Sequence, residues 1–392
     1  MAWDERTVEQ MREEFVRRVL AQEQTKAALC REYGISRPTG DKWIERFLQG
    51  ETMSDHSRAP KSVPCKISAE TEAEIVRLRK QYPALGAVKL RKIMESSGYS
   101  DLPCARTFNN IFQRNGLIEP EASLAATPHQ RFEKTVPNEM WQADFKGHFR
   151  LKDGRSCHPL NILDDFSRFN LCIEALTNET FEAVKPVVER LFKEYGLPFS
   201  FLCDNGNPWG TAQSLGYTRF EVWLMELGVL TLHGRPHHPQ TQGKEERFNR
   251  SFTRECLKGT VFSDKAHAQT CFDEYRSFYN EIRPHFALDL DVPAKHYRSS
   301  SKKMPDKIEA WEYGPEYKLC KVKETGFFNF NGQGFFLSEA FGGKTIAVRE
   351  SHLPGQITLV FRNFKIGRID LDKRVYTLKR AYLLEGDPRV NV

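Results

Sequence analysis

Hydrophobic residues in the first 117 positions recur with the period of a helix. Apolar side chains return every three or four residues over 8–20, 70–81 and 87–96, which is the spacing of an amphipathic helix. Residues 25–47 predict two helices joined by a short turn, because the first ends at Gly34 and Ser36 can cap the second. That arrangement is typical of a helix-turn-helix.

A second group of helices is predicted over 67–117, with a last helix that ends near Gly116. The outward faces of both groups are predicted to be polar, and Arg, Asn and Gln match guanine and adenine edges in the major groove. The candidate DNA contacts are Arg37, Thr39, Lys42 and Arg46 in the first unit and Arg106, Asn109, Asn110, Gln113 and Arg114 in the second. A helical hairpin with solvated charges explains the first unit equally well. Two units in tandem favour a long, bipartite DNA site.

Two polar segments separate these parts. Residues 51–66 are basic and contain proline, so we expect an extended, flexible linker. Arg58 and Lys61 are candidates to follow a DNA groove, although a plain spacer explains them as well. Residues 118–138 form a second connector without clear periodicity.

Beyond residue 138 the pattern changes to short apolar runs that alternate with helical segments. The predicted strands are 142–151, 161–166, 169–175, 200–203 and 229–232, and the predicted helices are 180–195, 220–227, 241–257 and 266–279. Antiparallel strands followed by strands that alternate with helices predict a mixed five-stranded α/β sheet with helices on both faces.

The last part of the chain predicts a small β-barrel and a tail, because short strands between 327 and 369 are separated by turns that contain glycine. The predicted fold class is therefore multidomain. The predicted domains are a helix-turn-helix domain over 1–50, a linker over 51–66, a second helix-turn-helix domain over 67–117, a linker over 118–138, an α/β core over 139–300, and a barrel with its tail over 301–392.

Composition adds constraints to this picture. No run of about 18 apolar residues occurs, so no membrane span is predicted. The nine cysteines are irregularly spaced without a Cys-x-x-Cys pair, which indicates reduced thiols in the cytoplasm and argues against a disulfide framework or a zinc site. The net charge of +6 is compatible with nucleic-acid binding, but many enzymes share it.

Three acidic residues mark the candidate chemistry. Asp144 lies within a strand, Asp204 lies at a strand end before Asn-Gly, and Glu246 lies on a helix. A charge in an apolar strand is costly unless it binds something positive. Asp204 has another explanation, since it can cap the turn. Glu245 competes with Glu246, and helix phase does not choose between them.

Oxygen ligands without cysteine indicate a hard cation, Mg²⁺ or in its place Mn²⁺. Two such ions about 3.5–4 Å apart can clamp a phosphodiester. Lys244, Arg247 and Arg250 lie beside the glutamates and would neutralise phosphates. Asp164 and Asp165 are further strand acids that the residue pattern alone leaves as possible members of the site.

Five motifs together carry a resemblance. They are WQAD at 141–144, LDDFSR at 163–168, CDNG at 203–206, HPQTQGKEER at 238–247 and YNEIRPH at 279–285. In order and spacing they resemble bacterial insertion-sequence transposases of the retroviral-integrase type, which have a DDE catalytic core. The branch encoded in a single reading frame, with helix-turn-helix units at its N-terminus, is the most similar.

The resemblance implies a ribonuclease-H-like core with Asp144, Asp204 and Glu246 as metal ligands. The glutamate of the family lies four residues after the Gln of Gln-Gly-x-x-Glu, which selects Glu246 and leaves Asp164 and Asp165 structural. The chain departs from the family in two places. Residues 209–216 resemble an inserted loop, and Asn249 stands where many relatives carry an aromatic residue or His.

The implied reaction is cleavage at the ends of a mobile element, followed by attack of the freed 3′-hydroxyl on target DNA. The helix-turn-helix units would bind the terminal inverted repeats, and the protein would form a dimer or a higher oligomer because two ends must meet. Two rival interpretations are a domesticated DNA-binding protein or repressor without strand transfer, and a nuclease of the same fold that cuts without joining.

Overall fold

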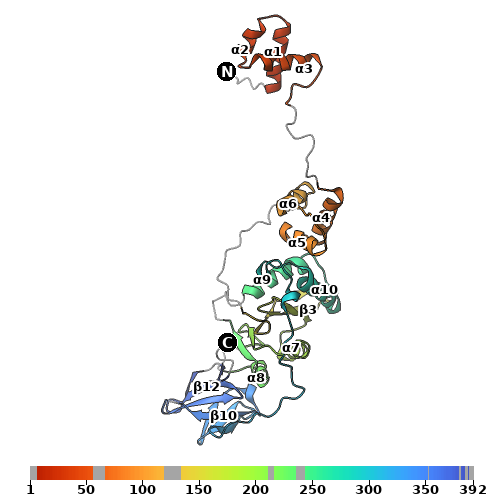
Figure 1. Ribbon diagram of the computed structural model, residues 1–392. Coiled ribbons are helices and arrows are strands. Elements are labelled where there is room, and N and C mark those ends of the chain that lie inside the picture. Colours follow the sequence, from red (N-terminus) through yellow and green to blue (C-terminus); the bar gives the residue numbers. More distant parts are fainter. Residues whose placement is uncertain are drawn as a thin grey trace. The chain divides into compact units, whose positions relative to one another are not determined.

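The computed structural model describes residues 7–55, 67–118, 134–210, 216–234, 243–351, 353–378, 381–384 and 387. The chain forms two compact units, Met1–Ile67 and Ser68–Val392 (Figure 1). None of the helices in the described ranges has the length and apolar character needed to cross a bilayer.

The first unit consists of α1 (Val8–Leu20), α2 (Lys26–Glu32) and α3 (Arg37–Leu48). Ser36 caps α3 by accepting a hydrogen bond from the backbone of Thr39 at 3.3 Å, as the sequence predicts. Gly40 lies where α3 meets α1 and α2, and a Cβ there would stand 2.9 Å from the sulfur of Cys30 and 3.1 Å from the ring of Phe15. Glycine therefore lets the second helix of the predicted helix-turn-helix pack closely on the first.

The second unit begins with α4 (Ala69–Gln81), α5 (Ala87–Ser96) and α6 (Ala105–Arg114). Phe108, Ile111 and Phe112 bury one face of α6. This helical group is attached to the rest of the unit by specific contacts. The ring of Tyr82 stacks on Phe278 with centroids 4.7 Å apart, and Arg254 donates to the carbonyl of Ala84 at 2.9 Å.

The centre of this unit is a mixed sheet. Its strands are β1 (Met140–Phe145), β2 (Phe149–Arg150), β3 (Ser156–Asp164), β4 (Asn170–Leu176), β5 (Ser200–Cys203) and β6 (Leu230–His233). The order is β4-β3-β1-β5-β6, with β3 antiparallel to β4 and β1, and with β1, β5 and β6 parallel. The predicted mixed sheet is confirmed. The predicted strand 142–151 is wrong as one element, because the chain breaks near Gly147, which has φ +85°.

Helices cover both faces of this sheet (Figure 1). The helices α7 (Phe181–Tyr195) and α8 (Arg219–Glu226) share one apolar cluster with Trp141 and Ile162. On the other face, α9 (Gly243–Phe252) and α10 (Lys265–Ser277) share a second cluster with Leu163. A short helical segment, η2 (Thr253–Leu257), follows α9. Further short helical segments follow α10: η3 (Phe278–Ile282), η4 (Phe286–Leu288) and α11 (Pro293–His296).

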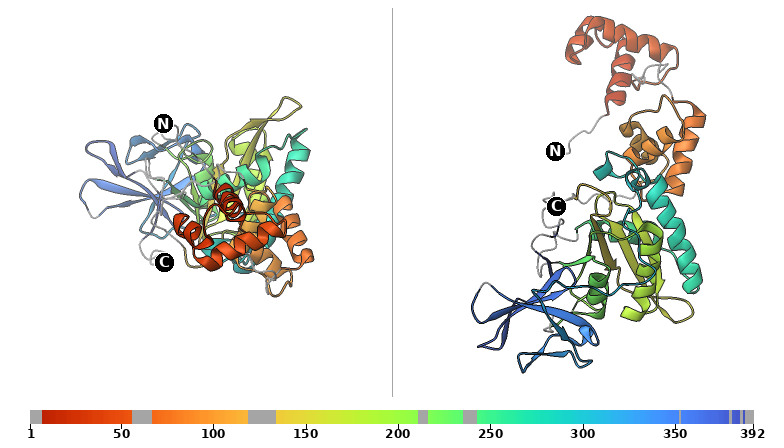
Figure 2. Two further views of the ribbon diagram at one scale, coloured as in Figure 1. Left: turned by 90° about the horizontal axis from the view of Figure 1, so that it is seen from above. Right: turned by 60° about the horizontal axis from the view of Figure 1, so that its bottom comes forward.

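The last part is an antiparallel sheet, in which β13 (Val375–Leu378), β12 (Phe364–Asp370), β11 (Gln356–Phe361), β10 (Thr345–Glu350) and β7 (Lys318–Lys321) are neighbours. The strand β14 (Tyr382–Leu383) also pairs with β12, β8 (Phe327–Phe330) and β9 (Gln333–Phe336) form a hairpin, and η5 (Glu339–Phe341) is a short turn. Among the described residues no pairing joins β7 to β13, so the structure has an open sheet where the sequence predicts a closed barrel. Figure 2 shows these strands as a layer separate from the central sheet.

The motif at 279–285 holds the core together. The side-chain amide of Asn280 pairs with the backbone of Asn170, accepting at 2.8 Å and donating at 2.9 Å. The guanidinium of Arg283 donates twice to Glu255, at 2.7 and 2.8 Å, and the two side chains are only 6% and 5% exposed. This part of the resemblance motif is therefore structural.

We predict that Glu255→Leu destabilises the protein by about 3–5 kcal/mol, because it leaves the buried charge of Arg283 without its partner. Urea unfolding followed by circular dichroism measures the change. The control is Asp153→Asn, which weakens the exposed pair between Asp153 and Arg155 and should cost less than about 1 kcal/mol. Equal effects of the two substitutions would contradict the assigned role of Glu255.

Candidate active site

Asp144 and Asp204 lie at one edge of the central sheet. Asp144 is near the end of β1, and Asp204 directly follows β5, its parallel neighbour. The carboxyl ends of parallel strands meet at the same edge of a sheet. Burial, followed by the negative charge of Asp204, raises the pKa of Asp144 to about 6. The two carboxylates predicted from the sequence are thus close enough to repel each other.

The turn after β5 fixes Asp204. Its Oδ1 accepts from the backbone N–H of Gly206 at 2.9 Å, which is the turn-capping contact that the sequence leaves open. Its backbone carbonyl accepts a hydrogen bond from Nδ1 of His233 at 2.9 Å. Asp204 thus caps the turn and also lies at the edge of the sheet beside Asp144, so the two explanations offered for it are compatible.

The two glutamates of α9 differ sharply. Glu245 is 1% exposed, and neither of its carboxylate oxygens has a hydrogen-bond partner. Burial raises its pKa well above the usual value, and the charges of Asp144 and Asp165 raise it further. Glu246 is exposed. Within the described ranges no three acidic, His or Cys side chains lie close enough to hold one metal ion, so the predicted role of Glu246 stays a prediction.

The carboxyl groups of this site are chemically suited to bind a hard cation. The donors are carboxylate oxygens, which Mg²⁺ and Mn²⁺ prefer. Asp144 lies beside a like charge, and Glu245 is a buried carboxyl without a partner. Both features are costly for a folded protein. A divalent cation between the carboxylates would offset that cost.

Asp164 and Asp165 have partners for their oxygens. Asp164 accepts from the backbone of Asn138 at 2.7 Å and from the backbone and hydroxyl of Ser167 at 2.8 and 2.6 Å. Asp165 accepts from the side chains of Gln142 and Lys244, each at 2.5 Å. Both carboxylates thus form hydrogen bonds with neighbouring groups of the protein. The ammonium of Lys244, predicted to neutralise phosphate, forms an ion pair with Asp165 in this structure.

Asn249 is the residue that sequence reasoning undervalued. Its side-chain N–H donates to Oδ2 of Asp144 at 2.7 Å, and its oxygen accepts from Asn161 at 2.7 Å. It therefore ties α9 to β1 and β3. The sequence places it four residues after Glu245, on the same face of α9, but no local pattern marks its bonds to Asp144 and Asn161.

The candidate DNA contacts of α6 are on its outer surface. Arg106, Asn109, Asn110, Gln113 and Arg114 are all exposed, as predicted, although the guanidinium of Arg114 also donates to Glu72 at 2.8 Å. Arg247 and Arg250 on α9 are exposed too.

The candidates in the first unit are less uniform. Arg37 and Lys42 are exposed, and Thr39 is half-buried with its hydroxyl 2.8 Å from Ser36. The outward position predicted for Arg46 is wrong. Its guanidinium lies 4.9 Å from the ring of Trp43 and donates to the carbonyl of Ser54 at 3.2 Å. Arg58 and Lys61 lie outside the described residues, as does the segment 235–242 before α9.

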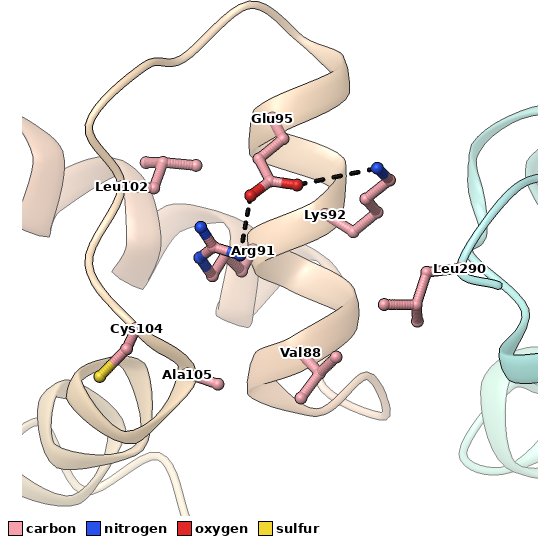
Figure 3. A pocket seen from close by; sticks show the side chains of 8 residues that line it. All are labelled: Val88, Arg91, Lys92, Glu95, Leu102, Cys104, Ala105 and Leu290. Carbon is pink, nitrogen blue, oxygen red and sulfur yellow. Dashed lines mark ion pairs between the residues drawn. The ribbon is translucent and has the colours of Figure 1, made fainter.

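A hollow of about 380 Å³ lies away from these carboxylates, between α5, the start of α6 and Leu290 (Figure 3). The side chains of Arg91 and Lys92 point to Glu95, at 2.7 and 3.8 Å. The charges that line the hollow are thus already paired, and it offers no ligand site.

Family models match most of the described chain. A helix-turn-helix domain matches residues 11–61, an integrase core domain matches 134–239 and again 227–293, and the C-terminal domain of IS481 family transposases matches 318–377. The chain therefore has the domain content of an insertion-sequence transposase, with a helix-turn-helix, an integrase core and a C-terminal domain of the IS481 type.

Individual relatives agree. The chain is 30% identical over 160 residues to an uncharacterized 31.7 kDa protein of insertion element IS407 from Burkholderia multivorans, covering 41% of this chain and 55% of that protein. It is 26% identical over 251 residues to a putative transposase for IS5376 from Geobacillus stearothermophilus, covering 62% and 61%. The transposase chain thus spans between 55% and 61% of the length of these relatives.

Solved structures with some likeness include the HTLV-2 integrase catalytic core domain in complex with magnesium. That likeness has 15% identity and a TM-score of 0.29, and covers 41% of this chain and 97% of that one. A simian T-cell lymphotropic virus intasome in complex with the PP2A regulatory subunit B56 gamma matches at 13% identity and a TM-score of 0.35, covering 79% and 100%.

We predict that the metal-free transposase loses stability as the pH rises from about 4 to about 6. A carboxyl whose pKa is raised in the folded state favours folding while it is protonated, and this advantage is lost as the pH rises through that interval. For Asp144, with a pKa of about 6 against 3.8, the loss is on the order of 3 kcal/mol. Asp144→Asn avoids it, so the variant should exceed wild type in stability at about pH 7.5 and equal it at about pH 4.

Denaturant unfolding in EDTA at the two pH values measures this difference. Glu246→Gln is the control, because this side chain is exposed and the substitution leaves Asp144 and its neighbours in place. If wild type and Asp144→Asn were equally stable at both pH values, Asp144 would not carry the raised pKa.

Proposed function

We propose that this protein binds the terminal inverted repeats of an insertion sequence, cleaves the DNA there and joins the 3′-hydroxyl to target DNA. The meeting of Asp144 and Asp204 at the carboxyl edge of the sheet is the observation that carries this proposal. The similarity to a putative transposase for IS5376 supports it.

Asp144, Asp204 and Glu246 would hold the metal ions. Asn249 keeps one oxygen of Asp144 in place. When bound, two divalent ions supply the charge that stabilises the attacking and leaving oxygens of a phosphodiester. Arg247 and Arg250, exposed on α9, bind phosphates beside the cleavage site.

Glu246 is exposed in this structure, so its role as the third ligand requires the first turn of α9 to shift or rotate when DNA or metal binds. Glu245 is the competing ligand, because it already lies beside Asp144.

Strand transfer by the full chain tests the proposal. The reaction contains Mg²⁺, a labelled duplex with the inverted repeat of the element, and a plasmid target. Wild type is expected to join label to plasmid. Glu246→Gln should bind the duplex without joining, because it removes a charged ligand. Glu245→Gln should still join, because a neutral amide of nearly the same shape replaces a buried side chain that has no hydrogen-bond partner.

The rival functions give different results in the same reaction. Nicking without joining favours a nuclease. Binding without reaction, in Mn²⁺ as well as Mg²⁺, favours a DNA-binding protein or repressor. If Glu245→Gln is inactive and Glu246→Gln is active, Glu245 is the third carboxylate and the assignment of Glu246 is wrong.

The exposed face of α6 is proposed to bind base edges in the major groove. We predict that Asn110→Ala weakens binding to the inverted repeat by about 1–3 kcal/mol, roughly 5–150-fold, and leaves binding to random duplex unchanged. Fluorescence anisotropy at fixed salt measures both. Arg77→Ala on α4, which removes an exposed cation paired with Glu74 at 2.7 Å, is the control. Equal losses on specific and random DNA would mean that Asn110 does not contact a base.

A further inference from the structure

One side chain links the end of β6 to the backbone of Asp204. His233 is paired with Cys203 in the parallel register of β6 and β5, so it stands beside the residue that precedes Asp204. Its ring lies between two oxygens. Nδ1 is 2.9 Å from the carbonyl of Asp204, and Nε2 is 2.9 Å from Oε1 of Glu221. A carbonyl oxygen only accepts, so Nδ1 carries the hydrogen of the first bond.

Glu221 is itself fixed. Its Oε2 accepts from the backbone N–H of Thr218 at 2.6 Å and lies 3.0 Å from the Thr218 hydroxyl, which closes the capping box of α8. The Glu221 side chain is only 13% exposed. Because the same carboxylate caps α8 and binds His233, the histidine is held against the end of a helix rather than against a mobile side chain.

The turn after β5 closes around the same ring. The side chain of Asn205 donates to the carbonyl of Gly234 at 2.9 Å. A Cβ on Gly210 would stand 2.9 Å from Cε1 of His233, so glycine is needed for the chain to pass the imidazole. Gly210 belongs to residues 209–216, which resemble an inserted loop, so the beginning of that segment passes close to the ring of His233.

We infer that His233 and Glu221 are positioning residues, which hold the Asp204 backbone so that its carboxylate faces Asp144. A hydrogen bond from a donor that is itself held in place restricts the rotation of the peptide that carries the ligand. The inference rests on the proposed function, because it assigns Asp204 as a metal ligand. The two residues would act only through Asp204 and would touch neither DNA nor metal.

Mn²⁺ affinity of the full chain, measured by electron paramagnetic resonance without DNA, tests the inference. His233→Phe keeps the size of the ring but loses both hydrogen bonds, and should weaken Mn²⁺ binding by about 10-fold or more, as loss of groups that orient ligands does. Glu221→Leu should have the same effect. Glu221→Gln should bind Mn²⁺ nearly as wild type, because an amide can accept from Thr218 and donate to a neutral His233.

The matched control is His158→Phe. His158 also pairs with a glutamate, Glu179, at 2.8 Å, and its side chain is 19% exposed against 21% for His233. His158→Phe should leave Mn²⁺ affinity unchanged. Unfolding in EDTA is measured for every variant, so that a general loss of stability is separated from a loss of metal affinity.

Three results overturn the inference. It fails if His233→Phe binds Mn²⁺ as wild type does. It also fails if His158→Phe loses as much affinity, or if Glu221→Gln loses as much as Glu221→Leu. A wild-type protein whose Mn²⁺ binding is unaffected by Asp204→Asn instead overturns the proposed metal site, and the inference with it.

Discussion

The main constraint on this structure is that like charges lie close together at the carboxyl ends of two parallel strands. Asp144 is half-buried beside Asp204, and both features raise the free-energy cost of ionising it. Glu245 adds a carboxyl that is shielded from water and has no hydrogen-bond partner. Such a cluster opposes folding. The surrounding elements must therefore be stable without it, and the two apolar clusters on the faces of the sheet meet that need.

The same sheet contains acidic residues with a different purpose. Asp164 has three hydrogen-bond donors within 2.8 Å, from Asn138 and Ser167, although burial, and to a smaller extent the charge of Asp165, raise its pKa. A carboxylate with its oxygens filled by protein donors has no room for a cation. The number of donors around each acid, rather than its burial, thus separates structural aspartates from candidate ligands in this fold.

Sequence patterns predicted most of the elements because helices and buried strands have clear periods. Hydrophobic periodicity did not reveal the break in the strand at Gly147, where a single glycine bends the chain. It also missed β7, because two lysines flank only two apolar residues there. The exposure of Arg46 was wrong for another reason. Helix phase placed it outward, but its long side chain folds back onto Trp43.

For the candidate site, the motifs led to Asp144 and Asp204, and only the resemblance chose between Glu245 and Glu246. Helix phase was insufficient, since the choice depends on how the first turn of α9 meets β1. The roles of Asn249 and His233 were also hidden. Each forms bonds to residues far away in the sequence, at Asp144 and Glu221, and no local pattern marks such contacts.

The position of α8 connects the last domain to the chemistry. Val222 and Met225 on α8 belong to the apolar cluster of the C-terminal sheet, and Lys344, which directly precedes β10, pairs with Glu226 at 2.6 Å. In the first turn of the same helix, Glu221 contacts His233, whose ring contacts the backbone of Asp204. The helix α8 therefore packs on the C-terminal sheet and also contacts the histidine beside Asp204. Because protein interiors are close-packed, a change in packing at one of these contacts is felt at the other.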